Sequence, residues 1–149
     1  MFNAALVALL TVFQPPTTPQ PSTPTQSVPK GEPCTASALV GTWQFMATAP
    51  AGVGVTSVLK HVTPTHFLVV RLTDKDVVES AQGGPYTLAG GMYTESVVHG
   101  FGARFEAARG ARNQFQCRLE GDVWHIAGES SGRQINEQSR RVAGQAPPR

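Results

Sequence analysis

Two glutamates, Glu95 and Glu137, lie on predicted strands that are flanked by apolar residues. Burial disfavours a charged carboxylate and raises its pKa, which makes such a group a candidate general acid or base. The side chains available as partners are His66, Tyr86, Tyr93 and Arg141. The same groups could instead form a static hydrogen-bonded network that fixes the fold. Both interpretations stay open, and the catalytic role of these residues is unknown from the sequence.

The sequence contains no recognisable motif for a metal site or for a catalytic nucleophile. The histidines show neither HxH nor HExxH spacing: His61, His66, His99 and His125. Such spacing is what places two imidazoles on one metal ion. Ser130 and Ser131 precede a glycine in a turn and lack the strand-turn-helix setting of a nucleophile elbow. We therefore expect no metal and no cofactor.

The two cysteines, Cys34 and Cys117, lie 83 positions apart and form no CxxC motif, which argues against a structural zinc site. In an oxidising compartment they could form one disulfide, and closing so long a loop would contribute about 4 kcal/mol in the chain-entropy description. The alternative is a pair of buried thiols that behave as small apolar side chains. The disulfide is expected if the protein is exported.

The charge balance does not favour nucleic acid as a partner. Twelve Lys and Arg against ten Asp and Glu leave a formal net charge of +2, which is too small to predict nucleic-acid binding. One local excess of arginine surrounds Glu106: Arg104, Arg109, Arg112 and Arg118. It is either a solvated edge of the fold or an anion site, and the solvated edge is the expected reading.

The elements that must position these residues are short strands. Runs rich in Val, Thr, Phe, Tyr and Trp alternate with glycine-containing turns every 8 to 12 residues, which is typical of an antiparallel all-β domain. The predicted strands are 40–48, 55–62, 65–73, 76–82, 84–89, 91–99, 102–107, 112–120, 122–128 and 133–142. No ten-residue stretch has helical periodicity, although one helical turn at 35–39 could precede the first strand.

Alternation along two strands indicates a polar interior. In 112–119, the apolar face carries Phe115 and Cys117, so Cys117 points inward. In 92–99, Tyr93 and Glu95 share one face, and the opposite face also carries polar groups. Since buried polar groups are costly unless they are paired or hydrated, this pattern indicates a cavity rather than a dry core.

The chain divides into four segments. An apolar segment at 1–14 matches the core of a secretory signal, and 15–33 is a Pro/Thr/Ser spacer that cannot bury enough surface to fold. The folded domain is expected at 34–143, followed by a disordered tail at 144–149. A ten-residue apolar run is too short to span a bilayer, so we expect no stable membrane span. The signal-like segment predicts a secreted, periplasmic or cell-envelope location.

An ordered series of motifs resembles the bacterial lipocalin-like (calycin) family of secreted proteins. The match covers roughly residues 38–143 and consists of Leu39-Val-Gly-Thr-Trp-Gln-Phe45, Thr65-His-Phe67, Gly83-Gly-Pro-Tyr-Thr-Leu88, Tyr93-Thr-Glu95, Gly121-Asp-Val-Trp124 and the closing Glu137-x-x-x-Arg-Val142. Two residues depart from the pattern: Pro85 removes a backbone donor from its strand, and Ser139 replaces the usual closing Trp. The resemblance implies an antiparallel up-and-down barrel of about 8 to 10 strands with a cavity, and it implies no reaction.

The resemblance also implies roles for individual residues. Trp43 would close one end of the barrel beneath a basic side chain from the last strand, either Arg141 or, in the other register, Arg140. His66, in the Thr-His-Phe motif, would be a pocket residue.

The function expected from the sequence is the binding of a small, largely apolar ligand inside the barrel. The residues expected to line or support the cavity are His66, Tyr86, Tyr93, Glu95 and Glu137. One alternative is an enzyme of the cyclase or isomerase type, as some calycin-shaped barrels are, with Glu95 and either His66 or Tyr93 as its acid–base pair. Another is a cell-envelope interaction domain with a filled barrel. The oligomeric state is unknown.

Overall fold

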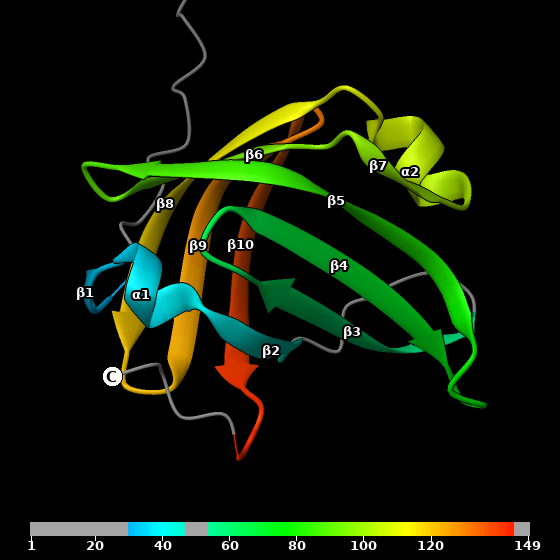
Figure 1. The fold of residues 1–149 in the computed structure, drawn as a ribbon, viewed down its shortest axis with the longest axis horizontal. Helices are drawn as coiled ribbons and strands as arrows, with labels where there is room; N and C mark the ends of the chain where they lie inside the picture. The colour runs from blue at the N-terminus through cyan, green and yellow to red at the C-terminus, as the bar shows by residue number, and fades with distance from the viewer. Residues whose placement is uncertain (1–29, 47–53, 145–149) are drawn as a thin grey trace, which may run out of the picture.

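The computed structural model describes residues 30–46 and 54–144 (Figure 1). The signal-like segment at 1–14, most of the spacer, positions 47–48 of the first predicted strand and nearly all of the tail lie outside the described residues.

Eight antiparallel strands close into a barrel, as predicted from the sequence (Figure 1). Around the barrel each strand pairs with the next, and the pairing of β8 with β9 closes the ring. The strands are β2 (Gly41–Phe45), β3 (Val55–Val62), β4 (His66–Thr73), β5 (Val78–Ala89), β6 (Met92–Ser96), β8 (Arg112–Glu120), β9 (Val123–Ser130) and β10 (Arg133–Arg141). Two short strands lie outside the ring: β1 (Glu32–Pro33) pairs with β8, and β7 (His99–Phe101) pairs with β5.

The long strand β5 replaces the two strands predicted at 76–82 and 84–89. Its first part pairs with β4 and β7, and from Tyr86 onward it pairs with β6. The two glycines at its centre, Gly83 and Gly84, allow this change of partner because neighbouring backbone approaches them closely. A Cβ on Gly83 would lie 2.5 Å from the carbonyl oxygen of Phe67. The turn predicted at these glycines is therefore absent. The strand continues through them, and the lack of a side chain lets neighbouring backbone lie close to it.

The strand predicted at 102–107 is wrong, because residues Ala103–Ala108 form the short helix α2. Its sequence is Ala-Arg-Phe-Glu-Ala-Ala, and five of these six residues have high helix propensity. Phe105 is its one buried residue, and the partly buried Ala108 packs against the same core. Six residues are too few to show a helical period in the sequence.

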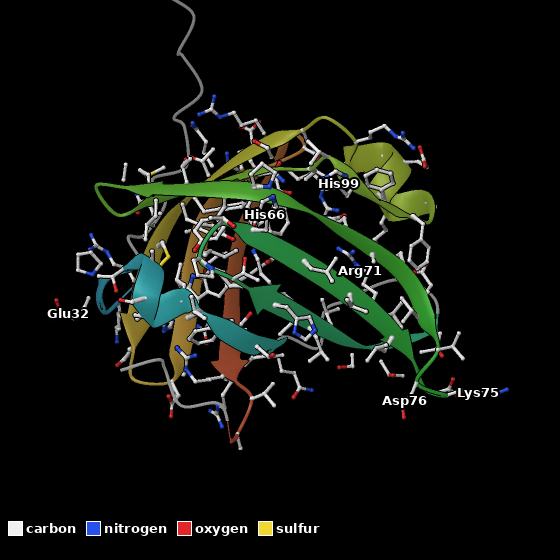
Figure 2. All side chains as sticks on the ribbon, in the orientation of Figure 1. Glu32, His66, Arg71, Lys75, Asp76 and His99 are labelled. Atoms are coloured by element: carbon white, nitrogen blue, oxygen red, sulfur yellow. A yellow bond between two sulfur atoms is a disulfide. The ribbon has the colours of Figure 1, made fainter. Side chains whose placement is uncertain are left out.

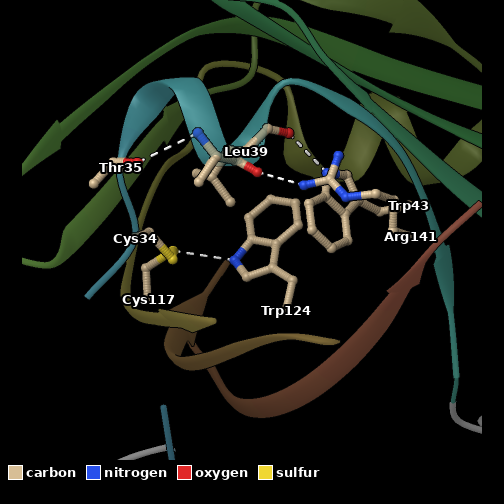
Figure 3. The surroundings of a disulfide bond; sticks show 8 residues. Cys34, Thr35, Leu39, Trp43, Cys117, Trp124 and Arg141 are labelled. Atoms are coloured by element: carbon tan, nitrogen blue, oxygen red, sulfur yellow. Dashed lines mark hydrogen bonds between the residues drawn. A yellow bond between two sulfur atoms is a disulfide. The ribbon is translucent and has the colours of Figure 1, made fainter. Parts of the chain in front are cut away.

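One end of the barrel is sealed by a compact group of side chains around two tryptophans (Figure 3). Trp43 and Trp124 meet edge to face with their ring centroids 5.4 Å apart, and both are buried. The helical turn α1 (Ala36–Leu39), capped by Thr35, lies across this end, and the carbonyl of Leu39 accepts a 2.8 Å hydrogen bond from Trp43 Nε1. The helical turn expected at 35–39 thus holds the indole in place.

The register of β10 against β2 places Arg141 opposite Trp43, and Arg140 opposite Gln44. The guanidinium of Arg141 lies 4.1 Å from the Trp43 ring and donates to the carbonyls of Val40 and Ala38 (Figure 3). Arg141 therefore joins the last strand to the α1 turn through one ring contact and two charged hydrogen bonds.

We expect Arg141→Ala to lower the free energy of unfolding by about 2 to 4 kcal/mol, since hydrogen bonds from a charged donor contribute about 1.5 to 3 kcal/mol and the ring contact adds to them. Arg140→Ala is the matched control, because Arg140 is an exposed neighbour on the same strand. Urea unfolding of both variants measures the effect. Equal losses in the two variants would contradict the role assigned to Arg141.

Candidate ligand-binding cavity

The barrel contains a partly open cavity of about 300 Å³. Its apolar wall consists of Phe45, Val58, Val69, Phe115, Trp124, Ile126 and Ile135. Its polar wall consists of Lys60, Arg71, Gln82, Glu95, Arg104, Asn113, Ser130, Arg133, Glu137 and Ser139. The polar interior expected from the sequence is present, and it is more strongly charged than the sequence indicated.

Strand register brings these side chains together from distant parts of the chain. In antiparallel strands, residues opposite each other point to the same face of the sheet. Lys60 on β3 lies opposite Val69 on β4, and Glu95 on β6 lies opposite Asn113 on β8. Alternation along each strand then sends every second side chain into the barrel.

The centre of the polar wall is an ion pair between Lys60 and Glu95. Both side chains are nearly buried, with exposed fractions of 12% and 5%. The ammonium also lies 4.7 Å from the ring centroid of Trp124, 4.9 Å from that of Tyr93 and 5.4 Å from that of Phe67. Lys60 thus has a carboxylate and three aromatic rings as neighbours, which compensates for its removal from water.

Lys60 was not among the residues predicted for the site. The signal is present in the sequence, because alternation places Lys60 on the same face as Val58 and Val62. A lysine on an otherwise apolar strand face requires either exposure or a buried partner. Which of these applies depends on Glu95, 35 residues later in the chain, and on the pairing of the strands.

The two predicted tyrosines support the cavity from behind and do not line it. Tyr93 is fully buried and Tyr86 is nearly so, with ring centroids 5.0 Å apart. The Tyr86 hydroxyl donates to the carbonyl of Thr63 at 3.0 Å. Burial, with the neighbouring charge of Glu95 as a smaller cause, raises the pKa of Tyr93 far above that of a free phenol. Tyr93 is therefore neutral at physiological pH.

The two predicted glutamates both reach the cavity. Burial raises the pKa of Glu137, the charges of Lys60 and Arg71 lower it, and the charge of Glu95 raises it further, with a net upward shift. Glu95 is the more deeply buried of the two and is held by Lys60.

His66 lies outside the cavity, in contrast to its predicted place in the pocket. Its side chain is exposed, and its Nδ1 atom lies 2.9 Å from the hydroxyl of Thr65 (Figure 2). The cause is parity, because the adjacent Phe67 points inward and is buried, so His66 must point outward. The Thr-His-Phe motif thus contributes its phenylalanine to the interior.

The remaining histidines are dispersed over the barrel. His61 contacts the Thr42 hydroxyl at 3.0 Å, His125 lies 3.6 Å from Glu120, and His99 is exposed. Over residues 30–46 and 54–144, no three His, Cys, Asp or Glu side chains converge on a point where a metal ion could bind.

The arginine-rich region around Glu106 is split by the structure. Arg109 pairs with Glu106 through hydrogen bonds of 2.7 to 3.2 Å and is exposed. Arg104, from the same helix, lines the cavity together with Arg71 and Arg133. The prediction of a solvated edge is therefore correct for Arg109. It does not hold for Arg104, which lines the cavity with Arg71 and Arg133, a grouping that the sequence does not reveal.

Comparison with known proteins shows a similarity to solved structures. No protein-family model matches the chain, and no curated protein does. The structure is similar to that of a lipocalin-like protein from Bacteroides uniformis, with a TM-score of 0.48, 16% sequence identity, and coverage of 70% of this chain and 98% of that one. In the described part of the chain, no helix is both long enough and apolar enough to cross a membrane.

Proposed function

We propose that this domain binds a small molecule inside its barrel. The observation that carries the proposal is the cavity of about 300 Å³ in the barrel. That volume is at the lower end of the range of about 300 to 1,000 Å³ that is typical of small-molecule sites. A barrel that served only as an interaction domain would be expected to fill this space with side chains.

The wall supports a ligand whose body is apolar. Aromatic and branched aliphatic side chains from six strands line the cavity: Phe45, Val58, Val69, Phe115, Ile126 and Ile135. Burying apolar ligand surface against them is favourable by about 25 cal/mol per Å². The polar wall would orient the ligand, so a ligand with both characters suits the cavity better than a purely apolar one.

The acid–base alternative gains nothing from the positions of its residues. His66 is exposed and outside the cavity, and the raised pKa of Tyr93 makes its phenol a poor acid and keeps its phenolate from forming. Glu95 is engaged by Lys60. Binding is therefore the function we propose.

We further propose that the protein is exported and belongs with the secreted lipocalin-like proteins that its motifs resemble. The disulfide between Cys34 and Cys117 supports this, because such bonds persist in oxidising compartments. Intact-mass analysis of the protein purified from the cell envelope tests it. The mass should be lower by the two thiol hydrogens, and a fully reduced chain would count against export.

Filling the cavity is expected to weaken ligand binding. Ile135→Trp adds bulk to a wall residue, and we expect the affinity for the neutral fluorescent probe phenylnaphthylamine to fall by about tenfold or more, since overpacking costs about 1 to 3 kcal/mol. The matched control is Asn136→Trp, an exposed position next to it on β10. Fluorescence titration measures both. Undiminished binding by Ile135→Trp, or no binding by the wild type, would refute the proposed site.

A further inference from the structure

We propose that the cavity binds an anionic group of its ligand, a carboxylate, sulfonate or phosphate, between Arg71 and Arg104, so that its ligands are small amphipathic anions. This inference rests on the proposed binding function and names the class of ligand.

The first observation is the charge of the wall. Four cationic side chains line the cavity, Lys60, Arg71, Arg104 and Arg133, against two carboxylates, Glu95 and Glu137. The ion pair of Lys60 with Glu95 removes one charge of each sign. Three arginines then face a single carboxylate, and that carboxylate has a raised pKa. The lining beyond the ion pair therefore carries more cationic than anionic side chains.

The second observation is the environment of Arg71 (Figure 2). Its Nη1 atom is buried and has no hydrogen-bond partner among the described residues. Burial lowers the pKa of Arg71, and the positive charge of Arg104 lowers it further, while the charges of Glu79 and Glu137 act in the opposite direction. A buried guanidinium donor without an acceptor is costly, and an anion from the ligand would supply the acceptor.

Two carboxylates lie near Arg71, those of Glu79 and Glu137. Glu79 accepts a 2.5 Å hydrogen bond from the hydroxyl of Ser80. Glu137 faces Lys60 and Glu95 as well as Arg71. Neither forms an ion pair within 4.0 Å of Arg71 in the described part of the chain.

Neutral donors lie on the same wall. The Oδ1 atom of Asn113 accepts a 3.1 Å hydrogen bond from the backbone N–H of Ser131, so its amide NH₂ remains a donor. Asn113 is only 3% exposed, and Gln82 and Ser130 add further polar groups to the same cavity. Guanidinium and amide donors together are a suitable set for an oxyanion.

The position of the arginines gives the ligand an orientation. Along β4, the inward residues run from Phe67 through Val69 to Arg71, from apolar to charged. Along β10, the cavity residues run from Ser139 through Glu137 and Ile135 to Arg133. The anionic group would lie at the Arg71 end, and the apolar body would lie against Phe115 and Ile126.

A matched pair of probes tests the inference on the full chain. Anilinonaphthalene sulfonate and phenylnaphthylamine share an aromatic skeleton and differ by the sulfonate. We expect the wild type to bind the sulfonate about tenfold to a hundredfold more tightly, because a charged hydrogen bond in a desolvated site contributes that much. The preference should fall toward onefold in Arg71→Gln and in Arg104→Gln, while the affinity for phenylnaphthylamine stays nearly unchanged.

Arg112→Gln is the control, because it removes the same charge from an exposed position on β8. It should keep the preference, which separates a local anion site from the general attraction of a basic protein. Arg104→Gln keeps the test decisive if Arg71→Gln fails to fold. Equal affinity of the wild type for both probes, or equal loss of preference in all three variants, would overturn the inference while leaving the binding function standing. Failure of both probes to bind would overturn both.

Discussion

Replacing Lys60 with methionine should lower the free energy of unfolding by about 3 to 5 kcal/mol, which is the usual cost of leaving one member of a buried ion pair without its partner. Lys60 is the ion-pair partner of Glu95, which is only 4% exposed, so its removal leaves a carboxylate among aromatic rings. Methionine keeps most of the volume and avoids a large cavity. Urea denaturation at neutral pH measures the loss.

The double variant Lys60→Met/Glu95→Gln separates charge from packing. Because it removes both charges, we expect it to recover most of the stability that the single substitution loses. Glu95→Gln alone tests the acid–base alternative as well, since it should abolish turnover and spare ligand binding if Glu95 is catalytic, whereas it should only lower stability if Glu95 is structural. If the double variant is as unstable as Lys60→Met, the loss comes from packing around the Trp124 and Tyr93 rings, and the ion pair is not its cause.

Local sequence predicts well which side chains of each strand point into the barrel and which point outward. Alternation in 112–119 placed Phe115 and Cys117 inward, and both are buried. The same rule applied to 92–96 puts Tyr93 and Glu95 on one face, as observed. These residues are predictable because the side-chain period of a strand is two wherever the strand is regular. The wrong placement of His66 came from the motif resemblance. Alternation alone places His66 on the face opposite to Phe67, which is where it lies.

The charged interior is harder to predict, because each charge is tolerated only through contacts between distant strands. Lys60 and Arg71 occupy inward positions on β3 and β4, beside valines that make these strands look like ordinary apolar segments. The partner of Lys60 is on β6, and the neighbour of Arg71 is on α2, which the sequence presented as a strand. Local patterns could therefore predict that the cavity was polar, but not that its charge was positive.

Loss of the Cys34–Cys117 disulfide should cost about 4 kcal/mol, the chain-entropy value for a bond between residues 83 positions apart. Cys34→Ala is the appropriate variant, because Cys117 keeps its sulfur as the acceptor of the 3.1 Å hydrogen bond from Trp124 Nε1. Cys117→Ala should cost about 1 to 3 kcal/mol more, since it also leaves the buried indole N–H without a partner. Dithiothreitol should lower the stability of the wild type to that of Cys34→Ala and leave the variant unchanged.

The reason for so large an effect is where the bond is attached. Cys34 follows the two-residue strand β1 and precedes α1, whose Leu39 is fully buried beneath the sealed end of the barrel. Besides the disulfide, the contacts that tie this segment to the barrel include the β1–β8 pairing, the hydrogen bond from the Cys34 N–H to the Cys117 carbonyl, the Arg141 hydrogen bonds and the Leu39–Trp43 hydrogen bond. If Cys34→Ala and the reduced wild type unfold at the same urea concentration as the oxidised protein, these contacts alone seal the barrel. A large loss shared by both would show that the segment needs a covalent bond to stay in place.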